Sequence, residues 1–98
     1  MNVQIQSVKF DADKKLVDFV NSKMSKLERF IEEAVSAEVI MRLDKDHDRG
    51  NKVATVKLVV PGDELVAEHR SKSFEESVDE CIDALKKQIA KYKERYNK

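Results

Sequence analysis

Apolar and polar residues alternate in four short segments of the chain, and this pattern predicts four β-strands. In the first segment, Val3 and Ile5 point to one side of the backbone while Gln4 and Gln6 point to the other. A Pro-Gly-Asp sequence at residues 61–63, typical of a tight turn, separates the last two segments. The four predicted strands are residues 3–10, 37–44, 52–60 and 65–71.

Two other segments repeat their apolar residues every three or four positions, which is the period of an α-helix with one buried face. The first begins after Asp11 or Asp13, either of which can cap a helix, and it continues to about Ala34. The second begins at Ser73, a predicted N-cap, and continues towards the C-terminus. The apolar positions of the two helices are Leu16, Phe19, Val20, Met24, Leu27, Phe30 and Ile31, then Val78, Ile82, Leu85, Ile89, Tyr92 and Tyr96.

The order β-α-β-β-β-α predicts a two-layer α/β (α+β) sandwich in which both helices pack on one face of a four-stranded mixed sheet. The first two strands are expected to be parallel, because a helix connects them, and the other strands should form an antiparallel meander. A chain of 98 residues builds one core, so residues 1–98 are expected to form a single domain. The open face of the sheet should be polar, with Glu38, Arg42, Lys57, Glu68 and Arg70 on it.

Composition narrows the class of protein. Hydrophobic residues make up 41% of the chain and charged residues 39%, which is typical of a globular domain with a heavily charged surface. No apolar run approaches the roughly 20 residues that a membrane span needs, so no membrane partner is expected. The start MNVQIQSVKF lacks the basic and apolar regions of a signal peptide, and the single Cys81 fits a reducing compartment. These features predict a cytoplasmic location.

The sequence does not predict an enzyme, a cofactor or a metal site. The loop DKDHDRG begins like an EF-hand, but Arg49 stands where that loop needs glycine and Thr55 where it needs a bidentate glutamate. His47, His69 and Cys81 lie on separate elements, so zinc is not expected, and Cys81 is interpreted as a small core residue. With only two glycines, the chain has no glycine-rich phosphate loop.

The positive charge of the chain gathers at one end, although the net charge is zero. Residues 61–83 carry eight acidic and two basic side chains, whereas residues 84–98 carry six basic side chains and one acidic. At about 100° per residue, Lys87, Lys91 and Lys98 fall on the outer face of the last helix. Lys86, Lys93 and Arg95 flank the apolar stripe of this helix. On the first helix, Lys15, Lys26 and Arg29 share one outer face and Lys23 lies at its margin. Two such helices side by side would offer a row of cations to phosphates, whereas a solvated helix end is the simpler interpretation.

The segment LVAEHRSKSFEESVDECIDALKKQIAKYKER is similar to the last strand and helix of the ribosome hibernation-promoting factor family, also called the ribosome-associated inhibitor or sigma-54 modulation protein family. Phe74 stands at the aromatic position of that family, Val78-Asp79 at its Ile-Asp step, and residues 85–93 at its terminal basic run. In the first helix, FVNSKMSKLERF resembles the family through Lys23 and residues 26–28. The length resembles the short form. The chain departs from the family at Glu76-Ser77, where two alanines are usual, and in the acidic DKDHD loop.

This resemblance implies a function. Such proteins bind the small ribosomal subunit over the decoding region, where they block messenger and transfer RNA, inhibit translation and preserve idle ribosomes in stationary phase and under stress. Short forms favour ribosome dimers alongside a second factor. The ribosomal RNA contacts that the resemblance implies are Lys23, Lys26, Lys87, Lys91, Lys93 and Arg95, with Phe74, Lys86 and Arg29 as additional contacts.

Two other functions remain open from the residues. A double-stranded RNA-binding domain carries a Lys-Lys-x-Ala-Lys signature that KKQIAK imitates, although that signature lies at the start of the last helix. A regulatory protein-interaction module, such as a modulator of a transcription factor, would use the same fold without contacting RNA. Salt-sensitive binding to ribosomes distinguishes the hibernation factor from this module.

Overall fold

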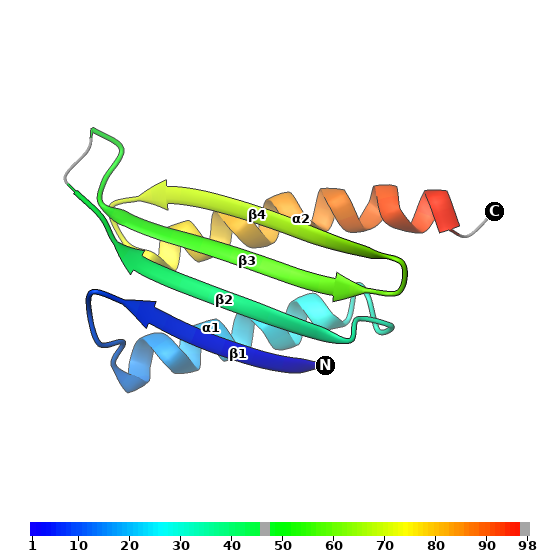
Figure 1. Ribbon diagram of the computed structural model, residues 1–98, viewed down its shortest axis with the longest axis horizontal. Helices are drawn as coiled ribbons and strands as arrows, with labels where there is room; N and C mark the ends of the chain where they lie inside the picture. Colours follow the sequence, from blue (N-terminus) through cyan, green and yellow to red (C-terminus); the bar gives the residue numbers. More distant parts are fainter. Residues whose placement is uncertain (46–47, 97–98) are drawn as a thin grey trace.

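The structure is a computed structural model that describes residues 1–45 and 48–96, and its six elements follow the predicted order (Figure 1). The strands are β1 (Asn2–Val8), β2 (Ser36–Leu43), β3 (Lys52–Val60) and β4 (Asp63–Ser71). The helices are α1 (Lys14–Glu28) and α2 (Phe74–Tyr96).

The four strands form one mixed sheet in the order β1-β2-β3-β4. Strand β1 pairs in parallel with β2, with Ile5 opposite Val39, and α1 provides the crossover between them. The β2–β3 and β3–β4 pairs are antiparallel. Gly62 has a φ of +80°, a backbone conformation that glycine adopts without strain, and it closes the tight β3–β4 turn. The predicted parallel pair and meander are confirmed.

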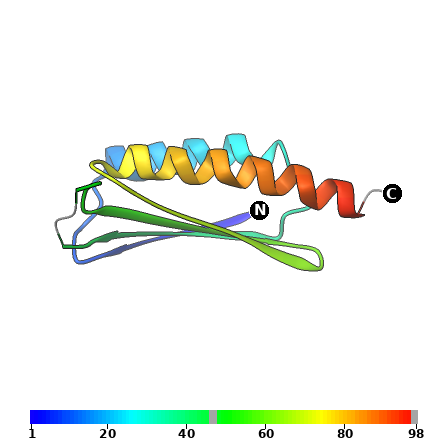
Figure 2. The same ribbon diagram turned by 90° about the horizontal axis from the view of Figure 1, so that it is seen from above.

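Both helices cover the same face of the sheet, and they run side by side in the same direction (Figures 1 and 2). The core lies between the two layers. Met24 and Leu27 of α1, Val56 and Leu58 of β3 and Leu85 of α2 are all fully buried there. Alternation in the strands and helical periodicity in the helices therefore supply one continuous core, as a two-layer sandwich requires.

No helix in residues 1–45 and 48–96 has the length and apolar character to cross a membrane.

The capping residues begin the helices as predicted. The Asp13 carboxylate accepts a hydrogen bond from the backbone N–H of Leu16 at 2.9 Å. The Ser73 hydroxyl accepts one from the N–H of Glu76 at 3.1 Å. Each cap satisfies a backbone donor that the first turn of a helix leaves without a partner.

The prediction that the first helix continues to about Ala34 is wrong, because α1 ends at Glu28. The backbone N–H groups of Phe30 and Ile31 donate to carbonyls three positions earlier, at 2.9 and 3.1 Å, so the last turn tightens. The chain must then reverse to place β2 beside β1. Ile31 turns into the core, whereas Phe30 is left 46% exposed.

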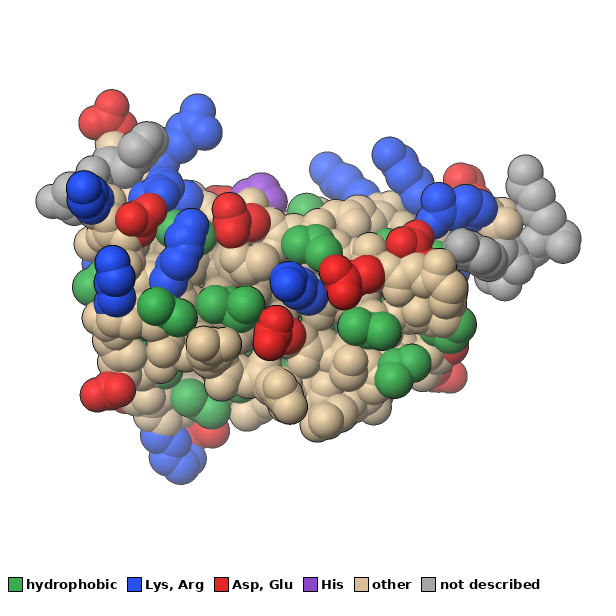
Figure 3. Space-filling view, viewed as in Figure 1, with side chains coloured by type: hydrophobic (Ala, Val, Ile, Leu, Met, Phe, Trp, Pro, Cys, Tyr) green, Lys and Arg blue, Asp and Glu red, His purple; other side chains and the backbone are tan. Residues whose placement is uncertain are grey.

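The open face of the sheet is mixed rather than polar, which corrects a second prediction. The five predicted charged residues do alternate with buried positions along β2, β3 and β4. Val59 and Val66 share this face, however, and are 36% and 41% exposed. Figure 3 shows cationic, anionic and apolar side chains interspersed across it.

Candidate nucleic-acid interface

The parallel course of α1 and α2 places the second half of α1 beside the first half of α2, and the last turns of α2 continue beyond the end of α1 (Figures 1 and 2). An ion pair marks the side on which the helices meet: Lys23 Nζ of α1 lies 2.9 Å from Asp79 Oδ1 of α2. Lys26 is three residues after Lys23 and therefore lies near the same side of α1. Lys23 and Lys26 thus lie towards the second helix rather than on a remote surface.

The middle of α2 contributes a cation to the same junction. Lys86 Nζ lies 5.0 Å from the centroid of the Phe30 ring, just beyond the end of α1. Lys93 is two helical turns further along α2 and shares this side. Lys87 and Lys91 are four residues apart, both exposed, and lie on the face of α2 that points away from the sheet.

We call the cations along these sides of the two helices the two-helix basic surface. Its members are Lys23, Lys26, Arg29, Lys86, Lys87, Lys91 and Lys93. All seven are exposed or half-exposed. In the described part of the chain, Lys23 is the one member that is paired with a carboxylate. Asp83 and Glu94 are also exposed on the outer side of α2, so this surface carries some negative charge as well.

Helix electrostatics account for only part of this patch. The negative end of a helix dipole attracts cations within its last turn, where Lys26 of α1 and Lys93 of α2 lie. Lys86 and Lys87 lie in the middle of α2, too far from its end for that effect. Glu75 and Glu76 stand at the start of α2, so the acidic and basic halves of the helix are separated. The helix dipole therefore does not account for the cations in the middle of α2.

The basic half of α2 is fixed to the β3–β4 hairpin. The Tyr92 hydroxyl donates a hydrogen bond to the carbonyl of Pro61 at 2.6 Å. The side-chain amide of Gln88 donates to the carbonyl of Val66 at 2.9 Å. Leu85 and Ile89, in the same part of α2, are buried in the core. These contacts hold the lysines on a rigid element instead of a frayed terminus.

The structure separates two predicted contacts from the two-helix basic surface. Arg95 points to the β3–β4 hairpin, where its guanidinium forms an ion pair with Asp63. Phe74 is only 8% exposed, and its ring stacks on Phe10 with centroids 4.4 Å apart. The family resemblance implied Phe74 as an additional RNA contact, but Phe10 of the β1–α1 connection covers its ring. Phe74 therefore packs within the protein.

Lys98 and His47 lie outside the described residues.

Comparison with known proteins decides the family. The family model described as "Sigma 54 modulation protein / S30EA ribosomal protein" matches residues 3–97. The chain belongs to this family. It is 32% identical over 95 residues to the ribosome hibernation promoting factor of Azotobacter vinelandii, a match that covers 97% of this chain and 85% of the relative. It is 31% identical over 83 residues to the ribosome hibernation promotion factor of Deinococcus radiodurans, covering 83% of this chain but only 43% of that longer protein.

Solved structures confirm the S30EA fold. A ribosomal subunit interface protein from Coxiella burnetii superposes with a TM-score of 0.85 at 22% identity, covering 95% of this chain and 98% of that one. The Protein Y N-terminal domain of Thermus thermophilus gives a TM-score of 0.79 at 19% identity, with 94% and 99% covered. At these identities the likeness establishes the fold alone.

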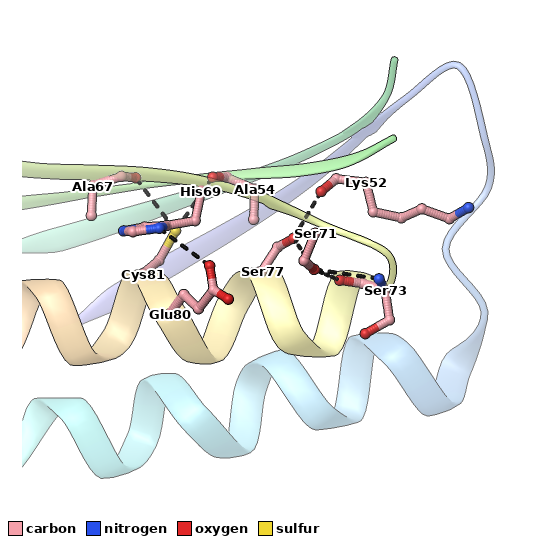
Figure 4. Close-up of polar contacts among 9 residues, drawn as sticks. All are labelled: Lys52, Ala54, Ala67, His69, Ser71, Ser73, Ser77, Glu80 and Cys81. Atoms are coloured by element: carbon pink, nitrogen blue, oxygen red, sulfur yellow. Dashed lines mark hydrogen bonds and ion pairs between the residues drawn. The ribbon is translucent and has the colours of Figure 1, made fainter. Parts of the chain in front are cut away.

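At the start of α2, buried hydroxyls form a polar network (Figure 4). The hydroxyls of Ser71 and Ser77 lie 2.7 Å apart. They also contact the carbonyls of Ser73 and Lys52 at 2.6 and 2.7 Å. Ser77 is completely buried, and these contacts satisfy its hydroxyl. The network therefore links the start of α2 to β3 and β4.

The remaining titratable groups near α2 are arranged as structural contacts. Burial raises the pKa of the Cys81 thiol to about 12, which makes Cys81 a poor nucleophile and a poor metal ligand. His69 Nδ1 lies 3.3 Å from the Glu80 carboxylate, across the β4–α2 contact (Figure 4). Within the described residues, no group of three or more His, Cys, Asp or Glu side chains is placed to hold a metal ion.

Proposed function

We propose that this protein is a ribosome hibernation factor that binds the small ribosomal subunit at the decoding region. Membership of the S30EA family and relatives named as hibernation factors support a ribosome-associated role in hibernation. The finer steps are part of our proposal: the two-helix basic surface lies on ribosomal RNA, the domain blocks messenger and transfer RNA, and translation stops while idle ribosomes are preserved. Residues 1–98 act in the cytoplasm as a single ribosome-binding domain, and a second factor assists any ribosome dimerisation.

The observation that carries this proposal is the set of seven exposed or half-exposed cations on α1, its C-cap Arg29 and the second half of α2. Each phosphate that a lysine or arginine neutralises releases counterions, so several contacts together give substantial affinity that falls steeply as salt rises. Cations directed at phosphates give no sequence discrimination. Such a surface therefore suits a fixed, folded RNA that is recognised by its shape.

The proposed exclusion of messenger and transfer RNA follows from the rigidity and size of the domain. The domain measures 45 × 27 × 18 Å, and its two layers share one core. A rigid body of this kind, held over the decoding region, excludes messenger and transfer RNA by occupying their space without any chemical step. Because the domain binds through many weak contacts, competition for a few of them is enough to release it.

Replacement of Lys87 and Lys91 by glutamate (Lys87→Glu with Lys91→Glu) tests the proposal. Both side chains are exposed, so the fold should survive while two phosphate contacts become repulsive. We expect the double variant to lose cosedimentation with small subunits at physiological salt, while its circular dichroism spectrum and melting temperature stay the same.

The matched control is Lys45→Glu with Lys72→Glu, which makes the same change in net charge at exposed positions at the other end of the molecule. This control should still cosediment. The patch assignment is rejected if the Lys87/Lys91 variant pellets as well as the original protein. If binding of the original protein to ribosomes does not occur, or does not respond to salt, a protein-interaction module becomes the better explanation.

A further inference from the structure

Phe30 is an exposed aromatic ring within the two-helix basic surface. The chain has four phenylalanines, and the other three are occupied: Phe10 and Phe74 stack on each other, and Phe19 packs against the core. Phe30 alone among them is exposed, at 46% of its surface. Lys86 reaches its ring from α2 and Arg29 precedes it in the chain, so the open ring lies among cations.

We propose that Phe30 is a stacking site for an unpaired nucleobase of the bound RNA, with Lys86 holding an adjacent phosphate. This inference rests on the proposed function and assigns a ligand to one position in the interface. A nucleotide consists of a flat π-system joined to an anion. The Lys86 ammonium lies over the Phe30 ring, 5.0 Å from its centroid, so a base stacked on the exposed part of the ring would bring its own phosphate near this cation.

The surrounding charges favour a base over a phosphate at Phe30 itself. Glu32 and Glu33 follow the ring in the chain and are both exposed. Carboxylates repel phosphates, but they tolerate an uncharged base. A base within a duplex hides its faces in the stack, so the ligand must be a single-stranded or flipped-out nucleotide.

The simpler interpretation is that Phe30 and Lys86 stabilise the protein by an internal cation–π contact. Surface contacts of this kind also occur without any ligand. The two interpretations predict different effects when the Phe30 ring is replaced by an aliphatic side chain. A structural contact predicts a change in the melting temperature, whereas a stacking site predicts a change in RNA affinity.

Phe30→Leu keeps an apolar side chain and removes the π-face, so it separates these interpretations. We expect it to weaken binding to small ribosomal subunits by about tenfold, with the original melting temperature, while Phe30→Trp binds as tightly as the original protein or more tightly. The control Val66→Ala removes a similarly exposed apolar side chain from the opposite sheet face and should leave binding unchanged.

Phe30→Trp also gives a direct probe, because the chain has no natural tryptophan. Its fluorescence should be quenched by a single-stranded oligoadenylate but not by inorganic polyphosphate, which has the charges without the bases. The control Val66→Trp should respond to neither polymer. Equal responses to both polymers, or no quenching by the oligoadenylate, overturn the stacking site.

The outcomes also distinguish this inference from the proposed function. If the original protein cosediments with small subunits and Phe30→Leu binds within about twofold of it, stacking is wrong and the basic surface stands. If the original protein does not cosediment, the stacking site fails together with the proposed function.

Discussion

Cys81 shows how a single residue can be polar, buried and inert in this protein. Its side chain is completely buried between α2 and the sheet. The thiol donates weak hydrogen bonds to the carbonyls of Ala54 and Ala67, at 3.3 and 3.6 Å (Figure 4). Burial is the main cause that raises its pKa, and the nearby carboxylate of Glu80 raises it further. The residue therefore serves packing, as the sequence predicted.

Thiol labelling tests this description of Cys81. A pKa of about 12 leaves almost no thiolate at pH 8, and the side chain is inaccessible, so the folded protein should react very slowly with a disulfide reagent. The same protein in denaturant should react promptly, because Cys81 is the one cysteine of the chain. Rapid, complete labelling of the native protein at pH 8 would contradict the buried environment.

Two aromatic residues mark the limit of residue-level prediction. The helical pattern placed Phe30 on the buried face, and the family resemblance implied Phe74 as an additional RNA contact. The structure reverses both, because α1 ends before Phe30 and because Phe10 covers Phe74. The covering of Phe74 depends on a partner distant in the sequence, which local periodicity does not register. The basic residues were easier to place, since a charged side chain on a helix is exposed by default.

The proposed interface lies mainly on α2. The position of the basic half of this helix is fixed by hydrogen bonds to the β3–β4 hairpin. Tyr92 and Gln88 donate hydrogen bonds to the carbonyls of Pro61 and Val66. The sequence placed Tyr92 in the buried stripe, which is confirmed at 5% exposure. The role of its hydroxyl could not be predicted, because it requires knowing that the hairpin turn lies beside the last turns of α2.

Tyr92→Phe measures the strength of this attachment. The change removes the hydroxyl and keeps the packed ring, so the free energy of unfolding should fall by about 1 kcal/mol. For a domain of this size, the melting temperature should fall by about 4–8 °C per kcal/mol. Thermal unfolding followed by circular dichroism gives the result. An unchanged melting temperature would show that the hydrogen bond to Pro61 does not contribute to stability.

Elements with clear boundary signals were predicted well, and the one without such a signal was not. Asp13 and Ser73 cap the helices through hydrogen bonds that the sequence indicated. The end of α1 has neither a glycine nor a proline to mark it, and the apolar Phe30 and Ile31 continue the helical period beyond it. The helix ends through the tightened last turn at Phe30 and Ile31, a local backbone change that the apolar pattern does not reveal.

At the scale of the whole molecule, the sheet separates two different surfaces. The helical layer presents the two-helix basic surface, and the opposite face of the sheet is a mixture of both charges and apolar side chains (Figure 3). The β-α-β-β-β-α order predicted the two different surfaces, because it places both helices on one face. Within the helical layer, the positive charge gathers in the second half of α2, while the acidic residues of this helix lie mostly in its first half.

The central claim is that the domain excludes transfer RNA by lying on the small subunit through its two-helix basic surface. The direct test is to measure transfer RNA bound to small subunits while the occupancy of this protein is raised to saturation. We expect bound transfer RNA to fall in proportion to occupancy, and to stay constant with the Lys87→Glu/Lys91→Glu variant. Full retention of transfer RNA on subunits saturated with the original protein would contradict the claim.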